Sequence, residues 1–388
     1  MLGVFYKYFR MRKIEGLLYS NNNKIALKIK HGIIQEIEQV TNFNDASAHK
    51  RFIAPGLIDN QVNGYIGVEF SKPNLSVNEM LDIVRMHRKH GVTTFMPTVI
   101  TASHKSLLNS FTNLSLTAHD PEVANAVSGY HLEGPYISPK DGYRGAHSLE
   151  DVRKPNWDEF QELNEAAQGK ILQITIAPEI DGAIEFIKKC VQNDIVIALG
   201  HHNASAAVIE RAVDAGARTV THLGNGMANM INRFENPFWQ QIADDRLMCS
   251  CILDGFHLPR EMVKVLYRSL TSKRIILTSD MTMLAGMPPG KYVWDGKDVV
   301  LTDDGVIRLP EQNCFAGASL PLRIGVENVM KFTDCSLSEA IDMASINPAK
   351  LYGLNDRGVI QVGNRADLIL FNFENGNINI IETVTVNT

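Results

Sequence analysis

The stretch DIVIALGHHNASAAVIERAVDAGARTVTHLG, residues 194–224, contains the repeating unit from which we expect the fold to be built. It opens with a short apolar run that ends in two histidines and continues into an amphipathic segment, residues 205–217. Ser205 is a candidate N-cap for a helix there, and Gly216 lies near the expected helix end. A second apolar run, RTVTHLG, follows and again ends close to a histidine. The pattern predicts a strand, a helix and a second strand.

The same alternation continues along most of the chain. Eight apolar runs are strand candidates, at 57–62, 93–100, 126–134, 171–178, 194–202, 218–224, 247–255 and 274–280. Most are followed by a helix-like stretch, which favours an α/β fold of the TIM-like (β/α)8 barrel type. A doubly wound open sheet is the main alternative, but no strand is followed by the G-x-G-x-x-G of a dinucleotide site.

The segments outside this run have β character. Residues 24–40 alternate apolar and polar side chains as a hairpin does, and 365–372 is a further strand candidate. Two Asp-Gly turns within 291–309 predict hairpins inserted after the eighth strand. We therefore expect a small β-sandwich domain formed by both ends of the chain. The expected division is a first part of this domain at 1–54, the barrel at 55–350 with the insertion at about 291–316, and the second part at 351–388.

The composition excludes several classes of partner. The 388 residues carry 38 basic and 43 acidic side chains, a net charge of −5, so no basic field favours nucleic acid. No run approaches the roughly 18 apolar residues that span a membrane. Five cysteines without a C-x-x-C pair predict a reduced, cytoplasmic protein. The N-terminal MLGVFYKYFRMRK lacks an apolar core before a cleavage site, so no signal peptide is expected, and Met11 is a second candidate start.

Polar side chains gather at the predicted strand ends, where barrel active sites lie. These residues are His131, Glu133, His201, His202, His222, Asp254, His257 and Asp280. One carboxylate and two imidazoles form a common zinc ligand set that leaves a position for water. Adjacent strand residues face opposite ways, so one of His201 and His202 faces the barrel mouth, and the pattern does not decide which. Histidines on the helical stretches, His87 among them, are expected at the surface.

The first predicted strand departs from that of many metal-dependent hydrolases. Its segment, APGLIDNQVNG (54–64), holds Gln61 and Asn63 where such enzymes carry a His-x-His metal pair. Neither amide is a strong zinc ligand. The segment alone fits either a lost metal site or one built from other residues.

A series of short motifs follows one order along the chain. They are PGLIDNQVNG, HGVTTFMPTVIT, HLEGPYISPK, GHHNA, THLGNGM, ILDGFHL, LTSD and the late SINPAKLYGL…GVIQVGNRADLILFN. Together they resemble the N-acetylglucosamine-6-phosphate deacetylases of the amidohydrolase superfamily, from about Ile14 to Asn372. The resemblance implies hydrolysis of the N-acetyl amide of an amino-sugar phosphate, which releases acetate and the free amine.

The resemblance also implies a metal site and its acid-base groups. Glu133, His201 and His222 match the ligands of a single divalent ion, with Zn²⁺ expected first and Fe²⁺, Mn²⁺ or Co²⁺ as alternatives. Asp280 matches the general base that later returns its proton to the leaving nitrogen. His147, in RGAH, matches a histidine near the acetyl carbonyl, where it would stabilise the oxyanion.

Further positions match substrate contacts and supporting residues of the family. The expected substrate contacts are Asn225, Gly226, Arg233 and His257. Arg233 is expected to serve the neighbouring subunit's site in a homodimer. In the one-metal branch of the family a Gln-x-Asn pair replaces His-x-His, so Gln61 is expected beside the metal-bound water and Asn63 at the Gly64 turn. The opening strand then belongs to a one-metal site.

One loop departs from the family and keeps alternatives open. The family commonly shows Thr-His-Leu-Tyr-Asn-Ala-Met, whereas this chain has Gly224 and Gly226 in place of the tyrosine and alanine. The missing side chains are expected to widen the wall beside the sugar, which leaves an unphosphorylated or different N-acyl sugar as a second candidate substrate. The absent His-x-His pair leaves a catalytically silent sugar-binding barrel as a third interpretation.

Overall fold

The computed structural model describes residues 11–294, 296–310 and 314–386, and within them an eight-stranded parallel sheet forms the centre of the molecule. Its strands are β5 (Leu57–Val62), β8 (Val92–Ile100), β9 (Tyr130–Glu133), β10 (Ile171–Ile176), β11 (Val196–Leu199), β12 (Thr219–Val220), β13 (Met248–Ile252) and β14 (Ile275–Thr278). They lie in chain order, each hydrogen-bonded to the next. Such an order is that of a TIM-like barrel.

The barrel closes where β14 meets β5, just beyond the end of each ladder. The backbone N–H of Asp280 donates to the carbonyl of Gln61 at 3.0 Å, and the N–H of Asn63 donates to the carbonyl of Met281 at 2.7 Å. A parallel bridge between Val62 and Met281 lies at the same place. The predicted barrel is confirmed, and the open doubly wound sheet is wrong.

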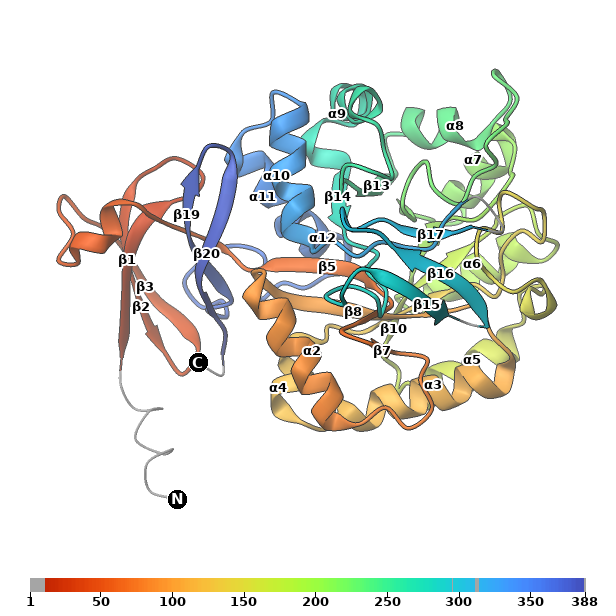
Figure 1. Ribbon diagram of the computed structural model, residues 1–388, viewed down its shortest axis with the longest axis horizontal. Helices are drawn as coiled ribbons and strands as arrows, with labels where there is room; N and C mark the ends of the chain where they lie inside the picture. Colours follow the sequence, from red (N-terminus) through yellow and green to blue (C-terminus); the bar gives the residue numbers. More distant parts are fainter. Residues whose placement is uncertain (1–10, 295, 311–313, 387–388) are drawn as a thin grey trace.

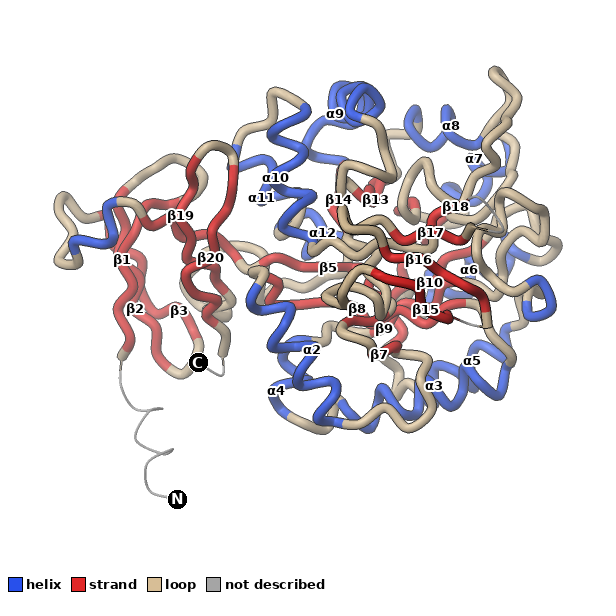
Figure 2. The backbone as a smooth tube through the Cα atoms, in the orientation of Figure 1, coloured by secondary structure: helices blue, strands red, loops and turns tan. Residues whose placement is uncertain are grey.

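Helices surround the strands, as Figures 1 and 2 show. They are α2 (Val77–Lys89), α3 (His104–Thr117), α4 (Pro121–Ala126), α5 (Trp157–Ala166), α6 (Ala183–Gln192), α7 (Ala206–Asp214), α8 (Pro237–Ala243), α9 (Arg260–Arg274), α10 (Leu322–Phe332), α11 (Leu337–Met343) and α12 (Ile346–Leu351). Their inner faces pack on the barrel in one continuous apolar core. In the stretch from 194 to 224, Ser205 occupies the N-cap position of α7, as predicted.

The strands that carry the polar residues are shorter than their apolar runs. The run 218–224 gives only the two residues of β12, and the run 194–202 gives the four of β11. Both ladders end because the backbone turns to positive φ shortly afterwards, at His222 (28°) and His201 (51°). The histidines therefore lie in the turns above the strands.

The two ends of the chain form a second sheet beside the barrel (Figure 1). It is one continuous six-stranded sheet in the order β20-β19-β4-β1-β2-β3. Its strands are β1 (Arg12–Leu18), β2 (Lys24–Lys30), β3 (Ile33–Gln39), β4 (Arg51–Pro55), β19 (Leu368–Glu374) and β20 (Asn377–Val384), and a short 3-10 helix, η2 (Ala46–His49), precedes β4. A separate apolar cluster that includes Leu27, Ile53 and Leu368 fills this unit.

A third, smaller sheet follows β14. It contains β15 (Gly290–Trp294), β16 (Lys297–Leu301), β17 (Ile307–Leu309) and β18 (Cys314–Phe315), which pair antiparallel in chain order. Its own apolar cluster includes Trp294, Val299 and Leu309. Near the barrel mouth the chain also forms the two-residue strands β6 (Gly64–Tyr65) and β7 (Val68–Glu69) and the 3-10 helix η3 (Leu149–Asp151).

His87 is buried, contrary to the surface position expected from its helix. It is 1% exposed, and its ring stacks on Phe95 with centroids 4.3 Å apart. Burial lowers its pKa to about 3, so the ring is neutral. Met80, Ile83, Val84 and His87 are the buried residues of α2, a spacing that marks one helix face. None of the helices in the described ranges is long and apolar enough to cross a membrane.

Candidate active site

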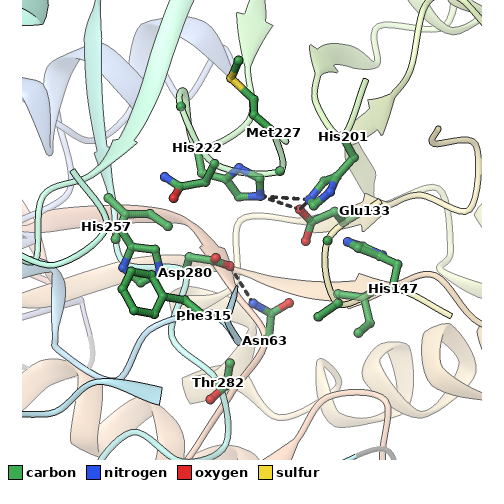
Figure 3. A pocket seen from close by; sticks show the side chains of 18 of the residues that line it. Asn63, Glu133, His147, His201, His222, Met227, His257, Asp280, Thr282 and Phe315 are labelled. Atoms are coloured by element: carbon green, nitrogen blue, oxygen red, sulfur yellow. Dashed lines mark hydrogen bonds and ion pairs between the residues drawn. The ribbon is translucent and has the colours of Figure 1, made fainter. Parts of the chain in front are cut away.

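Three buried side chains meet at the carboxyl end of the barrel (Figure 3). Glu133 is the last residue of β9, and His201 and His222 each lie two residues beyond a strand. The Oε1 atom of Glu133 is 3.2 Å from His201 Nε2 and 3.0 Å from His222 Nε2. The two Nε2 atoms are 3.1 Å apart. One carboxylate oxygen and two imidazole nitrogens are thus gathered around one point.

The backbone near these residues is strained. His201 (φ 51°), His222 (28°) and Asp280 (52°) all have positive φ, which non-glycine residues rarely adopt. Such conformations cost on the order of 1–3 kcal/mol each and concentrate at functional sites. The strain turns each side chain out of its strand and toward the common point.

The donor set fits a metal ion. His201 Nδ1 lies 3.0 Å from the carbonyl oxygen of Tyr143, so Nδ1 donates there and the neutral ring keeps its lone pair on Nε2. That lone pair faces a carboxylate oxygen and a second imidazole nitrogen. Three electron-pair donors at such distances repel one another unless a proton or a cation lies between them, and two imidazoles with one carboxylate are a known zinc set.

His202 does not belong to this group. Its Nε2 lies 2.5 Å from Nε2 of Gln241 in α8, and its Nδ1 accepts from the N–H of Ala204 at 3.3 Å. The alternation at the end of β11 therefore places His201 toward the mouth and His202 toward the helix layer. This settles the choice that the sequence left open.

Asp280, two residues beyond the end of β14, faces the same point. Its Oδ1 accepts from Gln61 Nε2 at 2.9 Å and from Asn63 Nδ2 at 2.8 Å. Burial raises the pKa of Asp280 to about 6. The two amides that stand in place of a His-x-His pair thus contact the carboxylate of Asp280, and the side chain of Asn63 does more than order the Gly64 turn.

His147 approaches Glu133 and His201 from the loop after β9. Its ring centroid is 4.4 Å from that of His201, and its Nδ1 lies 2.8 Å from Thr101 Oγ1. Burial lowers the pKa of His147 to about 3, so the ring is neutral near pH 7. Glu133, His147 and His201 also form a set with one ligand atom each within 4.8 Å of the others. His222 lies closer, with its Nε2 within 3.1 Å of both Glu133 Oε1 and His201 Nε2.

His257 lies on the opposite wall (Figure 3). Asp254 Oδ2 accepts from its Nδ1 at 2.7 Å, while Asp254 Oδ1 accepts the N–H of Phe256 and of His257. The carboxylate of Asp254 therefore both holds the turn after β13 and orients an imidazole. The His257 ring packs against Phe315 of β18 with centroids 5.0 Å apart.

The Gly224–Gly226 loop is not the widened wall that the sequence predicted. A Cβ at Gly224 would lie 2.9 Å from Met262 Cε and 3.0 Å from Leu258 Cδ2, so these side chains fill the place of the missing one. A Cβ at Gly226 would lie 2.8 Å from His201 Nδ1. The glycines allow close packing against a neighbouring helix and against His201.

These residues line a cavity of about 410 Å³. Its wall contains Glu133, His147, His201, His222, His257, Asp280, Asn63, Asn225 and Gly226, with Gln61 just behind Asp280. Arg233 is absent from this wall and lies exposed in the loop before α8. Buried Asn225 Nδ2 and Asn63 Oδ1 have no hydrogen-bond partner among the described residues, so each is free to bind a ligand.

Sequence reasoning missed three contributors to the site. Thr101 holds His147, and Phe315 and Arg308 line the cavity from the inserted sheet. The hairpins of this insertion were predicted, but the way they fold over the barrel mouth was not. The sequence alternation Ile307, Arg308, Leu309 could have indicated this contribution. In a strand it places the Arg308 side chain on the face opposite to that of its two apolar neighbours.

Comparison with known proteins gives one consistent result. The Amidohydrolase family matches residues 52–387. The N-acetylglucosamine-6-phosphate deacetylase of Bacillus subtilis (strain 168) is 30% identical over 323 residues, which cover 82% of this chain and 80% of that protein. The N-acetylgalactosamine-6-phosphate deacetylase of Escherichia coli O157:H7 is 29% identical over 345 residues, 88% and 89% of the two chains. The structure of N-acetylglucosamine-6-phosphate deacetylase from Thermotoga maritima matches with a TM-score of 0.84 and 28% identity, over 97% and 98% of the two chains.

Proposed function

Because this chain belongs to the N-acetylglucosamine-6-phosphate deacetylase family of the amidohydrolases, we propose that it hydrolyses N-acetylglucosamine-6-phosphate to glucosamine-6-phosphate and acetate. The observation that carries the proposal is the meeting of Glu133 Oε1 with the Nε2 atoms of His201 and His222 at 3.0–3.2 Å, in a cavity that Asp280 also lines. Metal-assisted amide hydrolysis uses such a ligand set together with an acid-base group.

Glu133, His201 and His222 would hold one divalent ion. We propose Zn²⁺, which these donors suit, with Fe²⁺, Mn²⁺ and Co²⁺ as alternatives because a mixed nitrogen and oxygen set accepts several ions. The bound ion supplies Lewis acidity, which acidifies a water molecule and polarises a carbonyl. Elemental analysis of the purified protein should give one equivalent per chain, since Gln61 and Asn63 offer no second pair of imidazoles.

Asp280 would move the proton. Two amide N–H groups occupy its Oδ1, which leaves Oδ2 to accept a proton from the attacking water. A C–O bond forms at the acetyl carbonyl carbon, and the C–N bond then breaks as Asp280 gives the proton to the departing nitrogen. The transfer is required because an amide anion is too basic to leave.

His147 would stabilise the negative oxygen that develops on the acetyl group. Its neutral ring has one N–H, and the Thr101 hydroxyl can occupy Nδ1 as a donor. We propose this tautomer, in which the proton is on Nε2 and is donated to the oxyanion.

Chelation and two neighbouring substitutions test the metal site. Removal of the metal should abolish acetate release from N-acetylglucosamine-6-phosphate, and added Zn²⁺ should restore it. His201→Gln should lose both bound metal and activity, whereas His202→Gln, whose side chain faces α8, should keep its metal. A metal-free protein with full activity would contradict the proposal. A purified protein that holds no metal, and that still hydrolyses nothing after Zn²⁺ is added, would favour the catalytically silent sugar-binding barrel.

The galactosamine epimer is a second candidate substrate. Similarity to an N-acetylgalactosamine-6-phosphate deacetylase is as high as similarity to the glucosamine enzymes. Measuring kcat/KM for both 6-phosphates decides between the epimers. A higher value for the galactosamine sugar would correct the substrate while leaving the reaction unchanged.

The unphosphorylated substrate has less support from this site. It was motivated by a wider wall at Gly224, but Met262 and Leu258 fill that place. We therefore keep the 6-phosphate in the proposal. Equal kcat/KM for N-acetylglucosamine with and without the phosphate would overturn it.

We further propose a homodimer. The loop before α8 and the helix itself expose three large apolar side chains close together in the sequence, Met230 (90%), Phe234 (74%) and Trp239 (53%). The guanidinium of Arg233 lies 4.5 Å from the Phe234 ring in the same loop, where it could reach a partner's cavity. Sedimentation should give twice the monomer mass, and Phe234→Ser should reduce it.

The cytoplasmic location remains a prediction from cysteine usage. The cysteines whose side chains are described, Cys190, Cys249, Cys251 and Cys335, form no disulfide. Cell fractionation followed by immunoblotting tests the location.

A further inference from the structure

Arg308 places in the cavity a cation that takes no part in the proposed hydrolysis. It lies in the middle of β17, between Ile307 and Leu309, which are 1% and 2% exposed and point into the core of the inserted sheet. Successive strand residues face opposite ways, so Arg308 projects to the other side, where it lines the cavity. Among the described residues that line the cavity, it is the only lysine or arginine.

The guanidinium has no hydrogen bond or ion pair to any residue in the described ranges. The ring of Phe315 lies 5.5 Å from the guanidinium carbon. The carboxylate of Asp304 interacts with the charge of Arg308 through space but makes no ion pair with it, and accepts from the Thr302 hydroxyl at 2.5 Å. An arginine has five N–H donors in a planar fork, so these donors are available to a ligand.

Phe315 connects this cation to His257. The aromatic ring contacts Arg308 on β17 and lies 5.0 Å from the His257 ring. Since Asp254 accepts from His257 Nδ1, Nε2 is the ring nitrogen of His257 left for a ligand, and the doubly protonated imidazolium donates from it. An imidazole and a guanidinium therefore flank one aromatic ring on the wall opposite Glu133 and His201.

We propose that Arg308, together with His257, binds the 6-phosphate of the substrate from within the same subunit and makes the enzyme selective for phosphorylated sugars. The proposal rests on the proposed deacetylase function and adds a specificity-determining residue to it. The phosphate suits this position because a guanidinium binds its oxygens with two parallel hydrogen bonds. The two carboxylates of the cavity, Glu133 and Asp280, would repel the same group.

The test compares Arg308→Gln with Lys291→Gln. Lys291 is exposed on β15 of the same sheet and does not line the cavity, so its substitution removes the same charge from the same unit. Arg308→Gln should lower kcat/KM for N-acetylglucosamine-6-phosphate by about 10- to 100-fold, mainly through KM, and leave the unphosphorylated sugar unchanged. Arg308→Lys should recover part of the loss, and it replaces the glutamine variant if that variant does not fold.

Binding of glucose-6-phosphate separates this proposal from the deacetylase function. This sugar has the phosphate but no acetyl group, so its Kd by calorimetry does not depend on hydrolysis. The Kd should rise about 10-fold or more in Arg308→Gln and stay within twofold in Lys291→Gln. If the wild type binds glucose-6-phosphate but cleaves no N-acetyl sugar phosphate, the deacetylase proposal fails and the phosphate site stands. A Kd unchanged in Arg308→Gln, or a loss equal in both variants, overturns the role of Arg308.

Discussion

At the scale of single residues, Asp280 decides whether the site can do acid-base chemistry. Gln61 and Asn63 hold one of its oxygens, and the other remains toward the cavity. Asp280→Asn keeps the shape but removes the proton acceptor, so kcat should fall about 10²- to 10⁴-fold. Steady-state kinetics checks this, and elemental analysis should find the metal retained. Turnover near that of the wild type in Asp280→Asn would refute the proton-transfer role.

The pKa of the same carboxyl group predicts the acid side of the pH profile. Burial raises the pKa of Asp280 to about 6, and the general base must be ionised to accept a proton. The rate kcat/KM should therefore fall as pH decreases through this region. A cation held by Glu133 and the two histidines favours the ionised form, so the midpoint should lie at or below about 6. A midpoint above pH 7 would argue against Asp280 as the base.

The residues of the site could be predicted from the sequence, but the directions in which their side chains point could not. Glu133, His222 and Asp280 stand at predicted strand ends, and the structure brings them together. The choice between His201 and His202 depends on the positive φ at His201, which no pattern of apolar residues encodes. The sequence places Gln61 beside a metal-bound water and Asn63 at the Gly64 turn, whereas the side-chain N–H groups of both residues contact Asp280.

At the scale of elements, the glycine that follows β9 packs against the threonine that holds His147. Gly134 has φ 79°, and a Cβ there would lie 2.1 Å from Thr101 Oγ1, the atom that contacts His147. Gly134→Ala should therefore displace Thr101 and lower kcat at least 10-fold, as loss of an oxyanion donor does in other enzymes, where it costs about 10²–10³.

Gly169 provides the matched control for this substitution. It has a similar φ of 72°, and a Cβ there would meet nothing within 4 Å. Both variants carry the strain of an alanine at positive φ, on the order of 1 kcal/mol, but only Gly134→Ala disturbs the site. Thermal melting and kinetics of the two proteins separate strain from displacement. An equal loss of activity in both would show that Thr101 is not the cause.

Element types were predicted better than element contacts. The alternation of apolar runs gave the eight barrel strands because each buried strand has to be continuous and apolar. The burial of His87 was missed, although its spacing from Met80, Ile83 and Val84 marks the inner face of α2. The contact of the inserted sheet with the barrel mouth depends on tertiary packing of Trp294 and Phe315, for which a local pattern gives no sign.

At the scale of the whole molecule, barrel closure depends on a buried carboxyl group. Asp59 of β5 is fully buried, and its Oδ1 accepts the N–H of Ser279 at 3.0 Å and the hydroxyl of Thr278 at 3.2 Å. Its Oδ2 has no hydrogen-bond partner among the described residues, and it has no ion pair there. One side chain thus joins the first and last strands at the cost of burying an acid.

That acid makes stability depend on pH. Burial raises the pKa of Asp59 from 3.8 to about 6, so between these values the folded protein binds more protons than the unfolded chain. Its contribution to stability is therefore favourable at low pH and is lost as pH rises through about 6. Asp59→Asn keeps the acceptor oxygen and removes the charge. The free energy of unfolding of this variant, relative to the wild type, should increase by about 2 kcal/mol between pH 4 and pH 8. Urea melts at the two pH values measure the change. A difference between the two proteins that stays constant with pH would mean that folding does not raise the pKa of Asp59.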